Sequence, residues 1–194
     1  MTETKDELLL SLRQARSGLL RGVEGLGEYE IRRPMTPTGT NLLGLVKHVA
    51  SVQLGYLGDV FGRPSSVPLP WFSPRAAPDD DLWVPATQST AEILELHRLS
   101  AEHADATVEA LALDAPGLVP WWPEGRREVT LHRILVHLIV ETARHAGHAD
   151  ILRELVSGAA GRGPDDQNLT PRTSQDWAEH RARIEAGARE AAGR

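Results

Sequence analysis

The sequence predicts an all-α protein, a four-helix bundle with a long crossover loop after the second helix and an added C-terminal helix. Four segments repeat apolar residues at the spacing of one helix face, and strand signals between them are sparse. Hydrophobic residues make up 41% of the 194 residues and charged residues 25%, as in a globular chain with one core. We therefore expect residues 1–158 to form the bundle, and residues 159–194 to form a linker and a helix that packs on the same domain.

The first two helices are predicted from their apolar stripes and their start signals. The first covers residues 4–26, where Thr4 and Glu7 match a capping box. The second covers residues 41–61, with Thr40 as its N-cap. All five tryptophans lie outside the main helices, so the core is expected to consist of Leu, Val, Ile and Ala.

A crossover and a short hairpin separate the remaining bundle helices. Residues 64–88 contain six prolines and are predicted to form the long crossover. The third helix is then predicted at residues 90–113, with Ser89 and Glu92 as a second capping box. Before the fourth helix, residues 117–130 are predicted to form a hairpin that turns at the sequence PEG.

The last two helices are predicted at residues 131–157 and 174–192. The first of them, the fourth helix of the bundle, is expected to have Thr130 as its N-cap and to stop at Gly158. The helix that follows is rich in Ala, Arg and Glu, with Trp177 as an apolar anchor. The fourth helix carries the residues on which the functional prediction depends.

Four polar residues share one narrow face of the fourth predicted helix: His137, Glu141, His145 and His148. At about 100° per residue they fall within about 40° of Glu141, and Leu138 and Leu152 flank them, so the face is expected to point inward. An ionised carboxylate in an apolar bundle costs several kcal/mol unless it is paired. A divalent metal bound by Glu141 and His145 would compensate this cost; a salt bridge at the rim is the alternative.

A second helix must supply a further ligand, and His48 is the candidate. Gly44 and Gly55 lie one and two turns along the same side of that helix and would leave room beside the imidazole. Each glycine costs about 0.5–1 kcal/mol relative to alanine in a helix, so space for a ligand is one reason to keep it. Close helix packing is the other reason, and a core histidine bonded to backbone or water is the alternative role of His48.

The remaining histidines and tryptophans receive simpler interpretations. His97, His103 and His180 are expected at the surface, and His132 and His137 near caps or in solvent. Trp121 and Trp122 are expected to anchor a loop over the bundle end rather than to form stacking platforms. Trp71, Trp83 and Trp121 are the loop residues that would roof a cavity above the metal.

Composition excludes several classes of function. The formal net charge is −6 with no basic block, so we expect no nucleic-acid partner. The chain has no cysteine, which excludes disulfides, thiolate metal sites and a cysteine nucleophile. No apolar run reaches the roughly 18 residues of a membrane span, and the acidic N-terminus does not look like a signal peptide, so we expect no membrane partner and a cytoplasmic location.

The two histidine-bearing stretches resemble the DinB-like superfamily of metalloproteins, closest to actinobacterial mycothiol S-transferases and mycothiol-dependent maleylpyruvate isomerase. The matching stretches are TGTNLLGLVKHVASVQLGYLGDVFGRP, STAEILELHRLSAEHADATVEAL and VPWWPEGRREVTLHRILVHLIVETARHAGHADILREL. The resemblance implies a four-helix bundle whose metal ligands are His48, Glu141 and His145. His148 stands where relatives often have Gln, which leaves it as a group that supports a ligand, a substrate contact, a catalytic group or an alternate ligand.

The resemblance also implies the chemistry. We expect a divalent metal, zinc before nickel or iron, that activates a low-molecular-weight thiol, mycothiol first, for attack on an electrophile. His148, Trp121 and Tyr56 are the expected substrate contacts, and a homodimer is expected. Hydrolysis by a metal-bound water, a non-haem iron oxygenase and a non-enzymatic metal- or ligand-binding stress protein are the alternatives.

Overall fold

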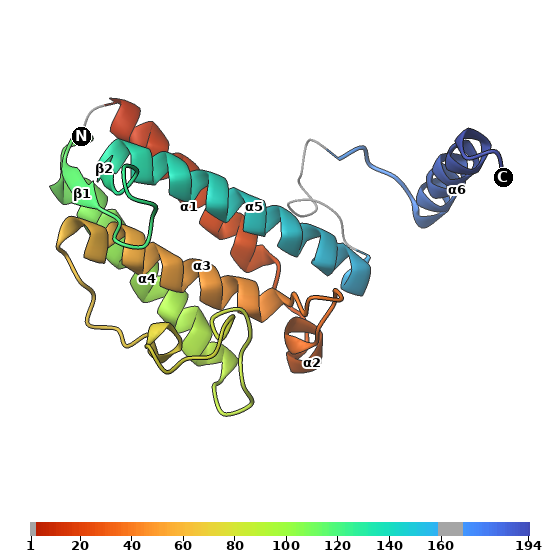
Figure 1. The fold of residues 1–194 in the computed structure, drawn as a ribbon. Coiled ribbons are helices and arrows are strands. Elements are labelled where there is room, and N and C mark those ends of the chain that lie inside the picture. The colour runs from red at the N-terminus through yellow and green to blue at the C-terminus, as the bar shows by residue number, and fades with distance from the viewer. Residues whose placement is uncertain (1–2, 159–168) are drawn as a thin grey trace. The chain divides into compact units, whose positions relative to one another are not determined.

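The computed structural model describes residues 3–158 and 169–194, which fall into two units that divide after residue 160 (Figure 1). The predicted all-α class is confirmed. Helices α1 to α6 are Glu3–Arg21, Glu28–Arg32, Leu42–Leu57, Thr90–Ala110, Leu131–Ser157 and Ser174–Ala191, the 3-10 turns η1 and η2 are Asp59–Phe61 and Pro70–Phe72, and strands β1 and β2 are Pro116–Leu118 and Glu128–Thr130. No helix of the described residues is long and apolar enough to cross a membrane.

Four long helices, α1, α3, α4 and α5, pack lengthwise in the first unit (Figure 1). Helix α1 packs mainly on α5, α3 packs mainly on α4, and α3 also contacts α5. Helices α3 and α4 run in parallel: Ser100 Oγ bonds the carbonyl oxygen of Ala50 near the middle of both helices, and His103, further along α4, lies close to Gly58 at the end of α3 (Figure 1). Parallel neighbours require a long connection, and the predicted crossover between α3 and α4 supplies it.

The core contains the residue types that composition predicted. Its fully buried side chains are mostly leucine and isoleucine from all four long helices, among them Leu12, Leu43, Ile93 and Leu135. Burying a side chain of this kind contributes about 1.5–3 kcal/mol, so these residues fix the packing of the helices. Tyr56 is the one aromatic side chain among the buried core residues that are described.

Three of the predicted helix boundaries are wrong, both ends of α1 and the start of α3. Helix α1 ends at Arg21 rather than residue 26, because the chain turns through a glycine-rich segment and then forms the short helix α2. Thr4 lies inside α1 and therefore is not its cap. Helix α3 is capped by Asn41 instead of Thr40, since its side chain accepts a 2.8 Å hydrogen bond from the Gly44 amide. Both residue types suit the cap position, so composition alone could not separate them.

The other boundaries agree with the sequence more closely. Ser89 and Glu92 form the predicted capping box of α4, which ends slightly early at Ala110. The predicted hairpin pairs β1 with β2. Thr130 caps α5 by accepting from the Arg133 amide, and α5 ends at Gly158, whose φ of 70° lies in the left-handed region that favours glycine.

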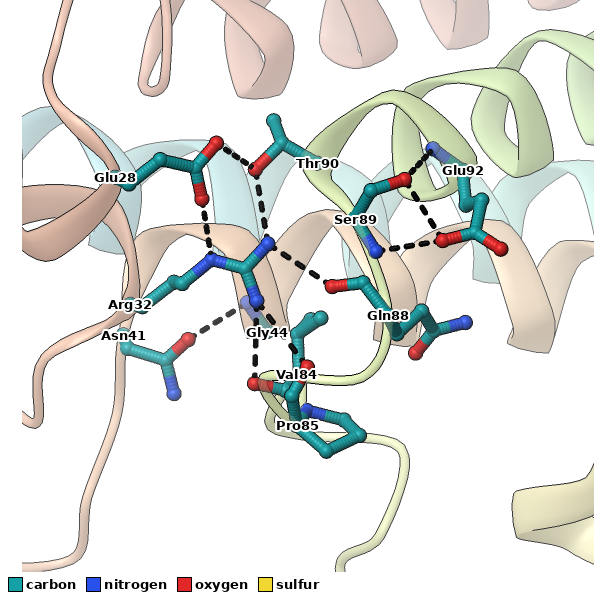
Figure 2. A network of polar contacts seen from close by, with 10 residues as sticks. All are labelled: Glu28, Arg32, Asn41, Gly44, Val84, Pro85, Gln88, Ser89, Thr90 and Glu92. Atoms are coloured by element: carbon teal, nitrogen blue, oxygen red, sulfur yellow. Dashed lines mark hydrogen bonds and ion pairs between the residues drawn. The ribbon is translucent and has the colours of Figure 1, made fainter.

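The end of the crossover is fastened to α2 by one arginine (Figure 2). Arg32 donates to the carbonyl oxygens of Val84 and Pro85 at 3.4 Å and to that of Gln88 at 3.0 Å. Glu28, one turn before Arg32, holds the guanidinium in place at 2.6 Å. Because several backbone carbonyls share one cation, this segment has its acceptors satisfied without forming regular secondary structure.

A buried polar chain crosses the bundle at mid-height. Arg16 donates to Gln53 at 2.6 Å, and Gln53 donates to Ser100 at 2.7 Å. His97 is 5% exposed beside this chain, so its predicted place at the surface is wrong. His103 is half-buried, and its Nε2 lies 2.7 Å from the carbonyl oxygen of Arg63. Buried polar groups that are paired in this way favour one arrangement of helices over others.

The second unit contains helix α6. Thr173 and Asp176 form a capping box at its start, and Arg172 lies over the ring of Trp177 at 4.6 Å. None of the residues of α6 is buried. The predicted linker over residues 159–168 lies outside the described residues, and the expected packing of α6 on the bundle stays a prediction.

Candidate metal centre

Helices α3 and α5 bring His48, Glu141 and His145 together. One nitrogen of each imidazole and one carboxylate oxygen lie within 4.8 Å of one another. Glu141 Oε1 is 3.0 Å from Nε2 of His145 and 3.7 Å from Nε2 of His48. The two imidazole rings meet edge to face with 4.9 Å between their centroids. The three residues that the sequence singled out therefore converge on one point between two helices.

The face of α5 that carries these residues borders the core rather than pointing into it. The side chains of Glu141, His145 and His48 are 30%, 13% and 18% exposed. Thr142 and Ala146 occupy the buried face of α5 instead. The expected inward direction therefore holds only in part, because the centre of the buried face lies to one side of this stripe.

The protonation states suit a metal ion. Burial alone would raise the pKa of Glu141, but the hydrogen bond to His145 and the neighbouring imidazoles outweigh burial and hold the pKa below its ordinary value. The pKa of His145 is also lowered, first by burial and then by the charge of His48. At neutral pH an ionised carboxylate therefore faces a neutral imidazole, which is the form in which each binds a metal.

The donor set fits a borderline ion of the zinc type. Two imidazole nitrogens and one carboxylate oxygen are usual zinc ligands, whereas magnesium and calcium prefer oxygen throughout. Donors that share a tetrahedral ion at about 2.0–2.2 Å lie about 3.3–3.6 Å apart, close to the separations of 3.0 and 3.7 Å found here. In addition, Nδ1 of His145 is buried with no hydrogen-bond partner among the described residues. The residues present therefore fit a divalent ion.

One neighbour of the centre was missed by the sequence prediction. Nδ1 of His48 lies 2.6 Å from Oδ2 of Asp81, which belongs to the crossover. Asp81 is the last of three consecutive aspartates, and a run of this kind in a loop usually means a solvated segment. No helical or strand spacing links it to His48, so the sequence held no signal for this contact.

His148 does not join the three converging residues. It is exposed on α5, and its ring centroid lies 5.4 Å from that of His145. Gly44, which was expected to make room for a ligand, has a different role. A Cβ at this position would collide with the carbonyl oxygen of Leu82, so Gly44 permits close approach of the crossover to α3. Gly44 therefore serves close packing, but against the crossover rather than against another helix as the alternative held.

An aromatic cluster surrounds His137, which lies one turn before Glu141 on α5. The hydroxyl oxygen of Tyr56 accepts hydrogen bonds from the indole N–H groups of Trp121 at 3.1 Å and Trp122 at 2.8 Å. His137 meets the Tyr56 ring edge to face at 4.8 Å, and burial lowers the pKa of His137. Trp121 is 53% exposed, so the cluster is open to solvent on one side. His137 is packed against rings rather than solvated as expected.

Trp71 and Trp83, the other two tryptophans expected to roof the centre, make no hydrogen bond or ring contact with its three residues in the described structure. Trp71 packs beside Leu54 and donates to Ser51 Oγ at 2.9 Å, and the ammonium of Lys47 lies 4.1 Å from its ring centroid. Trp83 is 50% exposed on the crossover. A hollow of about 780 Å³ lies elsewhere, between η1 and the hairpin, and none of the three converging residues lines it.

Comparison with known proteins adds an independent observation. A family model described as mycothiol-S-transferase matches residues 7–158, which include almost all of α1 and the whole of α2 to α5. A search of curated proteins gives no match. The matched range contains His48, Glu141 and His145 and accounts for well over half of the chain. The chain therefore belongs to the mycothiol-S-transferase family.

Proposed function

We propose that this chain is a metal-dependent thiol S-transferase in which His48, Glu141 and His145 hold a divalent ion, zinc in the first instance. Family membership indicates a thiol transferase with a thiol substrate. The dependence on a metal and the choice of mycothiol over other thiols are our proposal. The convergence of three donor atoms within 4.8 Å, from two helices, is the observation that carries it.

The ion, when bound, supplies a positive charge that lowers the pKa of a thiol or water beside it. The chain supplies the rest of the site. Glu141 contributes the one negative charge among the three proposed ligands, which leaves the centre attractive to an anionic sulfur. Three protein donors are fewer than a zinc-type ion takes, so the thiol has room to approach. The chain contains no cysteine, so the reacting sulfur must come from the cosubstrate.

We assign substrate contacts to Tyr56, Trp121 and His148. Two indole N–H groups occupy the acceptor positions of the Tyr56 hydroxyl, which leaves its own proton to donate to a ligand. The exposed half of Trp121 offers an aromatic face beside that hydroxyl. To His148, which is exposed next to His145, we assign a direct contact with the bound substrate.

Conjugation of mycothiol with monochlorobimane tests this proposal. Activity should be lost when the metal is removed, return when zinc is added back, and be absent from His145→Ala with zinc present. His132→Ala is the matched control, because His132 is exposed on the same helix and makes no side-chain contact with the centre. Full activity in the metal-free protein would contradict metal dependence while leaving the transferase role intact.

The position of His148 also favours a second candidate, hydrolysis with His148 as general base. Its ring lies 5.4 Å from that of His145, within reach of a water that bridges the two. Metal-dependent release of product from an ester or amide, without any thiol, would support hydrolysis. A requirement for the thiol would exclude it.

A homodimer is a further part of the proposal, as is a cytoplasmic location. Helix α5 exposes apolar side chains along one stripe, with Val140 at 63%, Ile151 at 60% and Leu155 at 70% exposed. Such a stripe favours burial against another surface. Sedimentation equilibrium of the full chain and of Val140→Lys tests this, because the variant should be monomeric if α5 forms the interface.

A further inference from the structure

We propose that Asp81 is a positioning residue for the candidate metal centre. The attachment of the crossover to α3 holds the Asp81 carboxylate against His48, and this carboxylate orients the His48 ring. This inference rests on the proposed function, because it concerns one of the three proposed ligands. The carboxylate of Asp81 does not reach the point where the ligands converge. It acts through the far nitrogen of the His48 ring.

The contact between the two side chains fixes which nitrogen of His48 carries a proton. Oδ2 of Asp81 lies 2.6 Å from Nδ1 of His48, and the two side chains are 15% and 18% exposed. An ionised carboxylate can only accept, so Nδ1 donates. In the neutral ring Nε2 then keeps its lone pair, and this is the nitrogen that lies 3.7 Å from Glu141 Oε1. The ring is thus held with its free donor atom aimed at the centre.

Lys47 holds the backbone on both sides of Asp81. Its ammonium donates to the carbonyl oxygen of Asp80 at 2.7 Å and to that of Trp83 at 2.9 Å. Lys47 is buried, with 2% of its surface exposed. Burying a lysine costs free energy unless its ammonium group is well paired. Because Lys47 is paired with two carbonyl oxygens of this loop, the loop conformation is strongly specified.

Asn41 and Gly44 complete the attachment. Asn41 Nδ2 donates to the carbonyl oxygen of Leu82 at 3.1 Å while its Oδ1 caps α3 through the Gly44 amide. Gly44 lacks the side chain that would push Leu82 away. The carbonyls of residues 80, 82 and 83 therefore all bond to α3 or its cap, and Asp81 lies within that bonded stretch. Further along, Arg32 holds residues 84, 85 and 88 in the same way (Figure 2).

A purely structural role for Asp81 makes different predictions. If its carboxylate only helped to fold the loop, removing it would lower stability without changing the protonated nitrogen of His48. The four attachments through Lys47, Asn41, Gly44 and Arg32 do not use the Asp81 side chain, so the loop should stay in place when that side chain is shortened. Asp81→Asn and Asp81→Ala thus separate positioning from folding.

The first test measures zinc affinity by competition with a chromophoric chelator. We expect Asp81→Ala to bind zinc about 10- to 100-fold more weakly than the wild type, and Asp81→Asn to be intermediate because an amide oxygen still accepts. Asp80→Asn is the matched control, with the same loss of charge one residue away, and should bind as the wild type does. Equal affinity in the wild type and Asp81→Ala would overturn the inference, whereas a wild type that binds no zinc would overturn the proposed function.

The second test reads His48 directly in the metal-free protein. Long-range ¹H–¹⁵N spectra distinguish a proton on Nδ1 from one on Nε2, and the His48→Ala variant assigns the signal. We expect Nδ1–H in the wild type and in Asp80→Asn, and a shift toward Nε2–H in Asp81→Ala. An unchanged tautomer in Asp81→Ala, with an unchanged circular-dichroism melting curve, would show that Asp81 does not position the ring.

Discussion

Nε2 of His48 on α3 lies 3.7 Å from Oε1 of Glu141 on α5. The two residues are 93 positions apart in the sequence and lie on two helices that pack against each other. Their approach, together with that of His145, leads to the expectations for metal content and for chelation.

Removing either imidazole should remove the metal. His48→Ala and His145→Ala each leave two donors, which is too few to hold a zinc-type ion tightly. We expect stoichiometric metal in the wild type and in His132→Ala, and a large deficit in the two ligand variants, by elemental analysis of dialysed protein. Retention of one ion per chain in both ligand variants would mean that the assignment is wrong.

Chelation should lower the thermal stability of the wild type. An ion that binds only the native state stabilises it by mass action, by about 2.7 kcal/mol when its free concentration is 100 times Kd. Scanning calorimetry with and without chelator should therefore show a clear fall in Tm for the wild type and almost none for His48→Ala. A wild-type Tm that ignores the chelator would favour a salt bridge at the rim over a metal.

His97 should make stability depend on pH. Burial, with a smaller effect from the charge of Arg16, lowers the pKa of His97 from 6.5 to about 4 in the folded protein. The unfolded chain therefore binds the proton more readily than the folded protein. The contribution of neutral His97 to the free energy of unfolding is complete above pH 6.5 and is lost as the pH falls toward 4. Between pH 7.5 and pH 5 the loss is about 2 kcal/mol.

Urea denaturation at these two pH values measures the effect. In His97→Leu the fall in unfolding free energy should be smaller than in the wild type by about that amount. The comparison isolates His97, because the other titrating groups are common to both proteins. Equal falls would show that His97 is protonated in the folded protein as easily as in the unfolded chain.

Two glycine substitutions should have opposite effects. Gly44→Ala places a Cβ against the carbonyl oxygen of Leu82, which is backbone and cannot easily move, so we expect marked destabilisation. Gly147→Ala lies on α5 with no atom within 4 Å of the new Cβ, and should stabilise the protein by about 0.5–1 kcal/mol. Urea denaturation of the two variants provides the measurement. A neutral Gly44→Ala would mean that the crossover can move away from α3 at little cost.

Tyr56→Phe should weaken the binding of the substrate more than it lowers the stability of the fold. The substitution keeps the ring against His137 but removes the acceptor of two indole N–H groups and the only O–H proton of the aromatic cluster. We expect KM for the thiol to rise by about tenfold or more, which corresponds to about 1.4 kcal/mol, with little change in bound metal. An unchanged KM would remove Tyr56 from the proposed substrate contacts.

The features that could be predicted from the sequence are those that depend on the periodicity of a helix. Spacing along α5 placed Glu141 and His145 together, and α5 begins and ends where Thr130 and Gly158 indicated. The same rule was available for His97, which shares a face with Ile93, Ser100 and Ala104, all of them buried in α4. The assignment of His97 to the surface followed its polarity and neglected its position.

Loops have no such periodicity, and the contacts of the crossover were missed for this reason. Asp81 contacts His48 because Lys47 and Asn41 bind the backbone of the crossover, and these contacts depend on carbonyl positions that side-chain patterns do not encode. Gly44 was noticed as unusual, but either a ligand or a neighbouring backbone would explain it. Only the position of Leu82 distinguishes the two explanations.

The packing of α5 against both α1 and α3 has a consequence for synthesis on the ribosome. Proteins are made from the N-terminus, so α1, α3 and α4 emerge first, with the surfaces that α5 will cover still exposed. At that stage the nascent chain carries His48 but neither Glu141 nor His145. The three donors come together only when the helix that closes the hydrophobic core arrives, which makes completion of the centre coincide with the last step of folding of the bundle.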